Sequence, residues 1–307
     1  MSNLHLTSSP HIRRDITTSS IMLDVILALA PATAVGIFLF GIRAFLVVAV
    51  CVASAVLSEF LFNLIAKKEQ TVGDLSAVVT GLLLGLNIPA NLPLWQAAIG
   101  SVFAIIIVKC IFGGIGCNVV NPAICARVFM IIAFSSTMAV ADYPLDAVSS
   151  ATPLVMLKDG ALPKISDLLI GFRGGAIGET CVIAILIGGI YLLIKKVITW
   201  HIPVAFIGTV FVLSFLLDGF SFTNALSWVL SGGLFLGAFF MATDYVTSPH
   251  ATVPKLIFGV GAGVITVLIR FYGNLPEGVS YAILLMNILN PYIEKIAPKK
   301  LFGGNAE

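Results

Sequence analysis

Long, unbroken apolar runs are the feature that most constrains how this chain folds. A helix that crosses the hydrocarbon core of a bilayer needs about 20 mostly apolar residues, whereas barrel strands alternate in short runs. The runs here do not alternate, and charged residues make up only 10% of the chain against 59% hydrophobic residues. That is too little polar surface for a soluble globule of 307 residues. The sequence therefore predicts an all-α polytopic membrane protein embedded in a lipid bilayer.

We predict about ten transmembrane helices in two groups of five. The first group comprises residues 21–40, 44–65, 71–89, 93–112 and 123–140, and the second comprises 178–197, 202–217, 226–241, 254–271 and 279–293.

The basic residues predict the orientation of these spans. An even number of spans puts both termini on one side, and cytoplasmic loops carry an excess of Lys and Arg. Short loops on the opposite side hold only Arg43 and Arg270, while Lys158, Lys164 and Arg173 lie in a longer opposite loop. The terminal side holds Arg13, Arg14, Lys67, Lys68, Lys109, Arg127, Lys195, Lys196, Lys255, Lys295, Lys299 and Lys300. We therefore expect a cytoplasmic segment at 1–20, a cytoplasmic tail at 294–307 and an extracytoplasmic loop at 141–177.

The two groups of spans carry similar sequence blocks in the same order. The block GLLLGLNIP at 81–89 corresponds to GLFLGAFFMATDYVTSP at 233–249, and each is followed by a span and a Gly-rich bend. Because an odd number of spans inverts the second copy, 21–140 and 178–293 are predicted to form two inverted five-helix repeats. The alternative is that Gly and Pro are simply frequent in membrane helices.

Several ionisable residues lie within or at the ends of the predicted spans. Each costs about 2.5 to 3.5 kcal/mol on insertion scales, so each needs a partner, a watery cavity or a function. Asp24 follows the start of a long apolar helix, and Asp244 lies among hydroxyl residues in MATDYVTSP. Lys109, Glu179 and Glu277 are equally compatible with helix-end side chains that reach the headgroups.

The bend GGIGCNVVNPA at 113–123 carries two amide side chains, Asn118 and Asn121. Amides at membrane depth need hydrogen-bond partners, which a flat heteroaromatic ligand or the neighbouring backbone would supply. The five cysteines show no CxxC pair, so we expect small buried thiols and no metal-ligating set. A thiol contributed to a shared site by Cys110, Cys117 or Cys125 stays open, because these three lie close in sequence around the bend.

The stretch DAVSSATPL at 146–154 opens the longest polar segment. On composition alone it is an ordinary turn. It resembles the acceptor motif of flavin transferases, with Asp146, Ser149, Ala151 and Thr152 at the motif positions and Ser150 where the motif has glycine. The resemblance implies that an extracytoplasmic flavin transferase attaches FMN to the Thr152 hydroxyl as a phosphoester.

Four blocks in order resemble one membrane-protein family across essentially the whole chain: SPHIRRD, GGIGCNVVNPA, FMATDYVTSP and IRFYGNLPEGVSYAILLMNILNP. This family joins the D subunit of the Rnf complex with the B subunit of the sodium-pumping NADH:quinone reductase. The segment before the first predicted span has only about 20 residues, and in this short length the chain resembles the Rnf D subunit.

The resemblance implies an electron-carrier subunit of an ion-translocating oxidoreductase in the prokaryotic inner membrane. Electrons would pass through covalent FMN between ferredoxin and NAD⁺, coupled to Na⁺ or H⁺ movement, with no catalytic residue of its own for either soluble substrate. The implied partners are the other Rnf subunits, including a flavin-bearing subunit and iron–sulfur subunits. The family also implies a noncovalent riboflavin, for which Asn118 and Asn121 are our candidates, and an ion pathway, for which Asp24, Asp244 and Glu277 are candidates.

A secondary transporter or channel without redox function is the competing hypothesis. Ten spans, inverted repeats and Gly- or Pro-broken helices are typical of such proteins. The flavin acceptor threonine separates the two hypotheses, because a transporter has no use for it.

Overall fold

The computed structural model describes residues 17–139, 152–273 and 277–296, and these residues fold into helices and connecting turns without a β-strand. Each of the ten predicted ranges contains helix. The all-helical class predicted from the apolar runs is confirmed.

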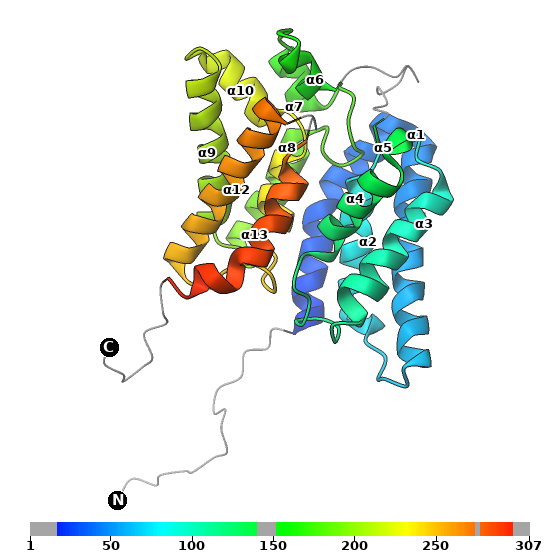
Figure 1. Ribbon diagram of the computed structural model, residues 1–307. Coiled ribbons are helices and arrows are strands. Elements are labelled where there is room, and N and C mark those ends of the chain that lie inside the picture. Colours follow the sequence, from blue (N-terminus) through cyan, green and yellow to red (C-terminus); the bar gives the residue numbers. More distant parts are fainter. Residues whose placement is uncertain (1–16, 140–151, 274–276, 297–307) are drawn as a thin grey trace, which may run out of the picture.

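The first helix, α1 (Thr18–Ile65), reverses direction at Gly41, where φ is 71° and ψ is −158°. A straight helix of this length would measure about 72 Å. Instead, Ser19 near its start donates to the Gly73 carbonyl at 3.1 Å, and Asn63 near its end donates to the Thr71 hydroxyl at 3.0 Å. Both ends of α1 therefore lie beside the same short segment, and its two arms correspond to the first two predicted spans (Figure 1).

The rest of the first half consists of short helices. These are η1 (Val72–Asp74), α2 (Ser76–Leu86), α3 (Leu94–Val102), the π-helical η2 (Phe103–Cys110), α4 (Pro122–Ala133) and α5 (Ser135–Met138).

The second half begins with two short helices, α6 (Pro153–Lys158) and α7 (Ile165–Ile170), inside the segment predicted as a polar loop. It continues through α8 (Val182–Ile194), α9 (His201–Leu217), α10 (Phe222–Leu230), α11 (Leu234–Leu236), the π-helical η3 (Gly237–Met241), α12 (Thr252–Tyr272) and α13 (Val279–Glu294).

Two of the described helices, α1 and α12, are long and apolar enough to cross a membrane. A third candidate is the pair Phe222–Leu230 and Leu234–Met241, which is bent by 64° at the break between α10 and α11. The remaining apolar helices are shorter, at 10–17 residues. The count of ten spans and the inverted repeat stay predictions.

The surface and the core of the molecule are both apolar. Large side chains such as Phe38 (79% exposed) and Ile65 (81% exposed) cover the outside, which suits contact with lipid tails. Inside, α8 packs on α1 so closely that a Cβ at Gly188 would lie 1.9 Å from the Ala28 carbonyl oxygen. Cys51, Cys110 and Cys181 are buried as expected, but Cys117 is exposed in the Gly-rich bend, where burial was predicted.

The start of α1 and the end of α13 lie at one end of the molecule, and α6 lies at the opposite end (Figure 1). Thr152 is the N-cap of α6, so it lies at the end of the molecule opposite the start of α1 and the end of α13.

Candidate functional site

Thr152 is the N-cap residue of α6. Its backbone is extended, with φ −62° and ψ 152°, and its hydroxyl oxygen accepts from the Val155 N–H at 3.4 Å. Pro153 follows at the first helical position, where its fixed φ suits a helix start. The Thr152 side chain is half-buried, and its hydroxyl hydrogen is not used by this cap. The other motif residues, Asp146, Ser149, Ser150 and Ala151, lie outside the described residues.

A cavity of about 380 Å³ lies next to Thr152. Its walls come from both halves of the chain, including Pro89 and Ile131 from the first and Tyr281 from the second. This volume falls within the range of pockets that hold organic ligands. Apolar side chains form most of the wall, while Arg127, Arg173, Glu179 and Glu277 supply charge.

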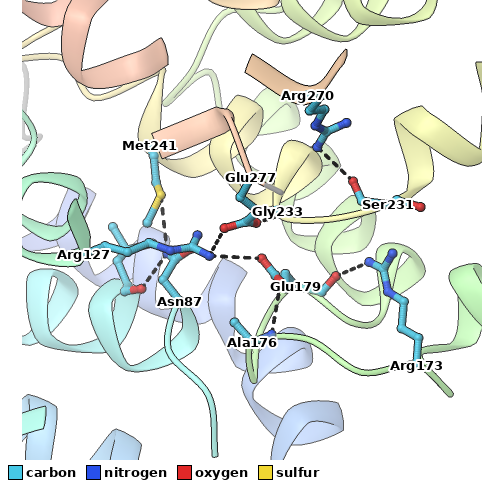
Figure 2. Close-up of polar contacts among 11 residues, drawn as sticks. Asn87, Arg127, Arg173, Ala176, Glu179, Ser231, Gly233, Met241, Arg270 and Glu277 are labelled. Carbon is cyan, nitrogen blue, oxygen red and sulfur yellow. Dashed lines mark hydrogen bonds and ion pairs between the residues drawn. The ribbon is translucent and has the colours of Figure 1, made fainter. Parts of the chain in front are cut away.

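Arg127 projects from α4 toward two carboxylates of the second half, Glu179 in the turn before α8 and Glu277 just before α13 (Figure 2). Its Nη2 forms an ion pair with Glu277 and lies 3.7 Å from the nearer oxygen of Glu179. Its Nη1 donates to Asn87 Oδ1 at 2.6 Å. Arg127 therefore pairs closely with one carboxylate and only loosely with the other.

Both carboxylates are held by backbone amides. Glu277 accepts from the Gly233 N–H at 3.0 Å, at the break between α10 and α11, and Glu179 accepts from the Ala176 N–H at 3.0 Å. The second oxygen of Glu179 and the Nε of Arg127 are buried without a hydrogen-bond partner. Buried polar atoms are normally paired, so these two mark the cluster as incomplete.

Two more buried arginines surround the pair. Arg173 donates to the carbonyls of Thr180 and Leu230, and Arg270 donates to those of Trp228 and Ser231. Their relative exposures are 4% and 0%. Burial lowers the pKa of Arg173 to about 10, so it keeps its charge at neutral pH. Among the described residues the cluster holds three guanidinium groups and two carboxylates, an excess of one positive charge.

A second, smaller cavity of about 100 Å³ gathers Asn118, Asn121 and Asp244. Asn121 caps α4 by accepting from the N–H groups of Ala123 and Ile124, and its amide donates to the Met241 carbonyl at 3.3 Å. Asn118 donates to the Val120 carbonyl at 3.1 Å. Of the two alternatives for these amides, the neighbouring backbone supplies their partners.

Asp244 accepts hydrogen bonds from the Val246 N–H at 3.3 Å and the Thr247 hydroxyl at 3.0 Å. Burial nevertheless raises the pKa of its carboxyl above the ordinary value. Asp244 therefore caps its own turn through these two hydrogen bonds.

Asp24 is in neither cavity lining. It accepts from the Tyr191 hydroxyl at 2.7 Å, and Lys195 Nζ lies 3.8 Å away on the half-exposed surface. The structure thus places Glu277, Asp244 and Asp24 at three separate locations instead of along one contiguous cluster.

Lys109 forms a separate buried ion pair with Glu59, at 2.9 and 3.0 Å from its two oxygens. The alternative that Lys109 and Glu179 reach the headgroups from helix ends is wrong, because both are buried and paired. Arg270 was likewise assigned to a short loop but is fully buried in α12. The sequence did not predict the cluster of Arg127, Glu179 and Glu277, because a charged residue near the end of a span gives no local sign of whether its side chain points into the protein or toward the headgroups.

The comparisons with known proteins cover nearly the whole chain. The model of the NQR2, RnfD, RnfE family matches residues 5–303. The D subunit of the Na⁺-translocating ferredoxin:NAD⁺ oxidoreductase complex of Acetobacterium woodii is 46% identical, over 98% of this chain and 96% of that protein. The corresponding subunit of the proton-translocating ferredoxin:NAD⁺ oxidoreductase complex of Clostridium ljungdahlii is 42% identical, over 97% of this chain and 96% of that protein. That of the ion-translocating oxidoreductase complex of Stutzerimonas stutzeri is 38% identical, over 93% of this chain and 92% of that protein.

Proposed function

Because the chain belongs to the NQR2, RnfD, RnfE family, we propose that it is the D subunit of an Rnf-type complex in the prokaryotic inner membrane. It relays electrons between ferredoxin and NAD⁺ through FMN carried on Thr152, and the complex moves Na⁺ or H⁺ across the membrane. The relatives named above differ in the ion that their names state, so their similarity supports ion translocation without choosing the ion.

The observation that supports this proposal most directly is the cavity beside Thr152. An acceptor threonine needs an approachable hydroxyl and a place for the bulky group that it receives. Thr152 has both, because its hydroxyl hydrogen is not used by the α6 cap and its side chain borders the cavity of about 380 Å³.

The residues around this cavity fit a flavin. The apolar wall suits an aromatic ring system, and Arg127 and Arg173 add positive charge to that wall. When bound, FMN supplies reversible two-electron chemistry. The protein's contribution is to hold the ring, exclude water and set the surrounding charge.

The smaller cavity does not fit a riboflavin as it stands. Its volume of about 100 Å³ lies below that of organic-ligand pockets, and the Asn118 and Asn121 amides are used by backbone. The noncovalent flavin stays a prediction of the family resemblance, and the two inverted five-helix repeats stay a prediction from the recurring sequence blocks.

The test is flavin fluorescence of the denatured protein on a gel, after coexpression with a flavin transferase. We expect fluorescence from the wild type and from Thr152→Ser, which keeps the hydroxyl, and none from Thr152→Ala. A wild-type protein without covalent flavin would refute the proposal and favour the transporter alternative. Fluorescence that survives in Thr152→Ala would place the flavin on another residue.

A further inference from the structure

The charge cluster beside the Thr152 cavity contains one more positive than negative group among the described residues. Removing an unpaired charge from water is costly, so a buried excess charge calls for a partner of opposite sign. In the described part of the chain, the two carboxylates of the cluster leave one guanidinium group without a counter-charge, and the Nε of Arg127 lacks a hydrogen-bond acceptor. The cluster is built to receive a negative charge.

Arg127 is the arginine placed to meet such a charge. Arg127 and Arg173 both line the cavity, but Arg173 and Arg270 are held by backbone carbonyls, whereas Arg127 is held by the side chains of Asn87 and Glu277. Its partners come from the two halves of the chain, Asn87 from the end of α2 and Glu277 from just before α13. Figure 2 shows its guanidinium group between these partners and Glu179.

We propose that Arg127 is the charge-compensating residue for the reduced flavin carried by Thr152, and that the Arg127–Glu277–Glu179 cluster thereby sets the flavin's redox potential. This inference rests on the proposed function. Two electrons and one proton reduce the neutral oxidised ring: the proton forms the N5–H bond and one negative charge remains on the ring. The electrons come from a reduced redox partner in the complex, or from dithionite in the test.

The sign of the effect follows from Coulomb's law. A positive charge near the ring stabilises the reduced form, and a negative charge destabilises it. For one unit charge at about 6 Å and an effective dielectric constant of about 20, the ratio of reduced to oxidised flavin changes on the order of 100-fold. That ratio corresponds to about 60 mV for a two-electron couple.

The experiment is a potentiometric titration of the purified, flavinylated full-length chain, followed by flavin absorbance. Arg127→Gln removes a positive charge and is expected to lower the midpoint potential by tens of millivolts, about 60 mV at the separation assumed above. Glu277→Gln removes a negative charge and is expected to raise the potential. The double variant Arg127→Gln/Glu277→Gln restores the net charge and is expected to return toward the wild-type value.

Three controls separate charge from structure. Arg127→Lys keeps the charge and is expected to stay closer to the wild type than Arg127→Gln. Lys195→Met removes a half-exposed lysine outside the cavity lining and is expected to leave the potential unchanged. Covalent fluorescence and the size-exclusion profile establish that each variant is flavinylated and folded.

Opposite shifts from the two single variants support the inference, because a general loosening of the site would move both in one direction. Shifts of the same sign, or no shift beyond the Lys195→Met control, overturn it while leaving the proposed function intact. Absence of covalent flavin from the wild type overturns both.

Discussion

The buried ion pair of Lys109 and Glu59 predicts how much stability the protein loses when one partner is removed. Lys109 Nζ lies 2.9 and 3.0 Å from the two Glu59 oxygens, and the side chains are only 3% and 2% exposed. Thr71 donates to Glu59 at 2.6 Å, and Lys109 also donates to the Ser76 hydroxyl. The pair therefore joins the second arm of α1 to η2 and to the start of α2 with its polar atoms satisfied.

Removing one partner leaves the other charge buried and alone. Such a change costs about 3–5 kcal/mol, whereas replacing both partners by apolar residues of similar volume is often neutral. We expect Lys109→Met to lower the apparent melting temperature on the order of 10 °C. Lys109→Met/Glu59→Met should recover most of that loss.

The assay is size-exclusion chromatography with fluorescence detection after heating the protein in detergent. The matched control is Lys195→Met, because Lys195 also lies near a carboxylate, Asp24, but is 52% exposed and 3.8 Å away. Exposed pairs contribute about 0–1 kcal/mol, so the control should melt near the wild type. Equal losses from Lys109→Met and Lys195→Met, or a double variant less stable than either Lys109→Met or Glu59→Met, would refute this reasoning.

Three further predictions follow from local geometry. Thr152→Ser should keep the α6 cap and Thr152→Ala should lose about 1 kcal/mol of stability in the same heating assay, independently of flavin; equal melting of the two would contradict the cap. Gly188→Ala places a Cβ 1.9 Å from the Ala28 carbonyl oxygen, so it should destabilise the protein by about 1–3 kcal/mol or more through overpacking. Its control, Gly208→Ala on α9, meets no heavy atom within 4 Å and should be neutral or stabilising, so matching losses would count against the packing argument. Burial raises the pKa of Asp244, so the folded state binds the proton of this carboxyl more tightly than the unfolded state does. The wild type should therefore gain stability relative to Asp244→Asn as the pH falls from neutral toward 3.8. A gain in stability on raising the pH would contradict this prediction.

Much of the fold could be read from the apolar runs, because burial in lipid or protein leaves a long local signature. The span predicted from residue 123 begins one residue earlier, at Pro122, where Asn121 and Pro122 form a cap that local sequence determines. The Gly-containing block that the sequence analysis identified at 233–249 begins at the break between α10 and α11. The reversal inside α1 was predicted as two spans, and Gly41 allows it because its backbone has a positive φ.

The cavity and its charges could not be read in the same way. Arg127, Glu179 and Glu277 lie far apart in the sequence, and their meeting depends on how α4 packs against turns of the second half. The positive-inside rule counted Arg127 and Arg270 as loop charges that report orientation. Both are buried, so neither is a surface charge of a loop. Conversely, Asp24 and Asp244 looked alike in sequence but lie in different surroundings.

The sequence by itself determined the all-helical membrane class and the family, and it predicts Thr152 as the acceptor, because hydrophobicity and short motifs are local properties of the chain. Only the tertiary structure decided which ionisable groups pair, where the two cavities lie and that the cluster beside Thr152 holds an excess positive charge. The physical reason is that the energy of a buried charge depends on its neighbours in space, and those neighbours are set by helix packing between distant segments.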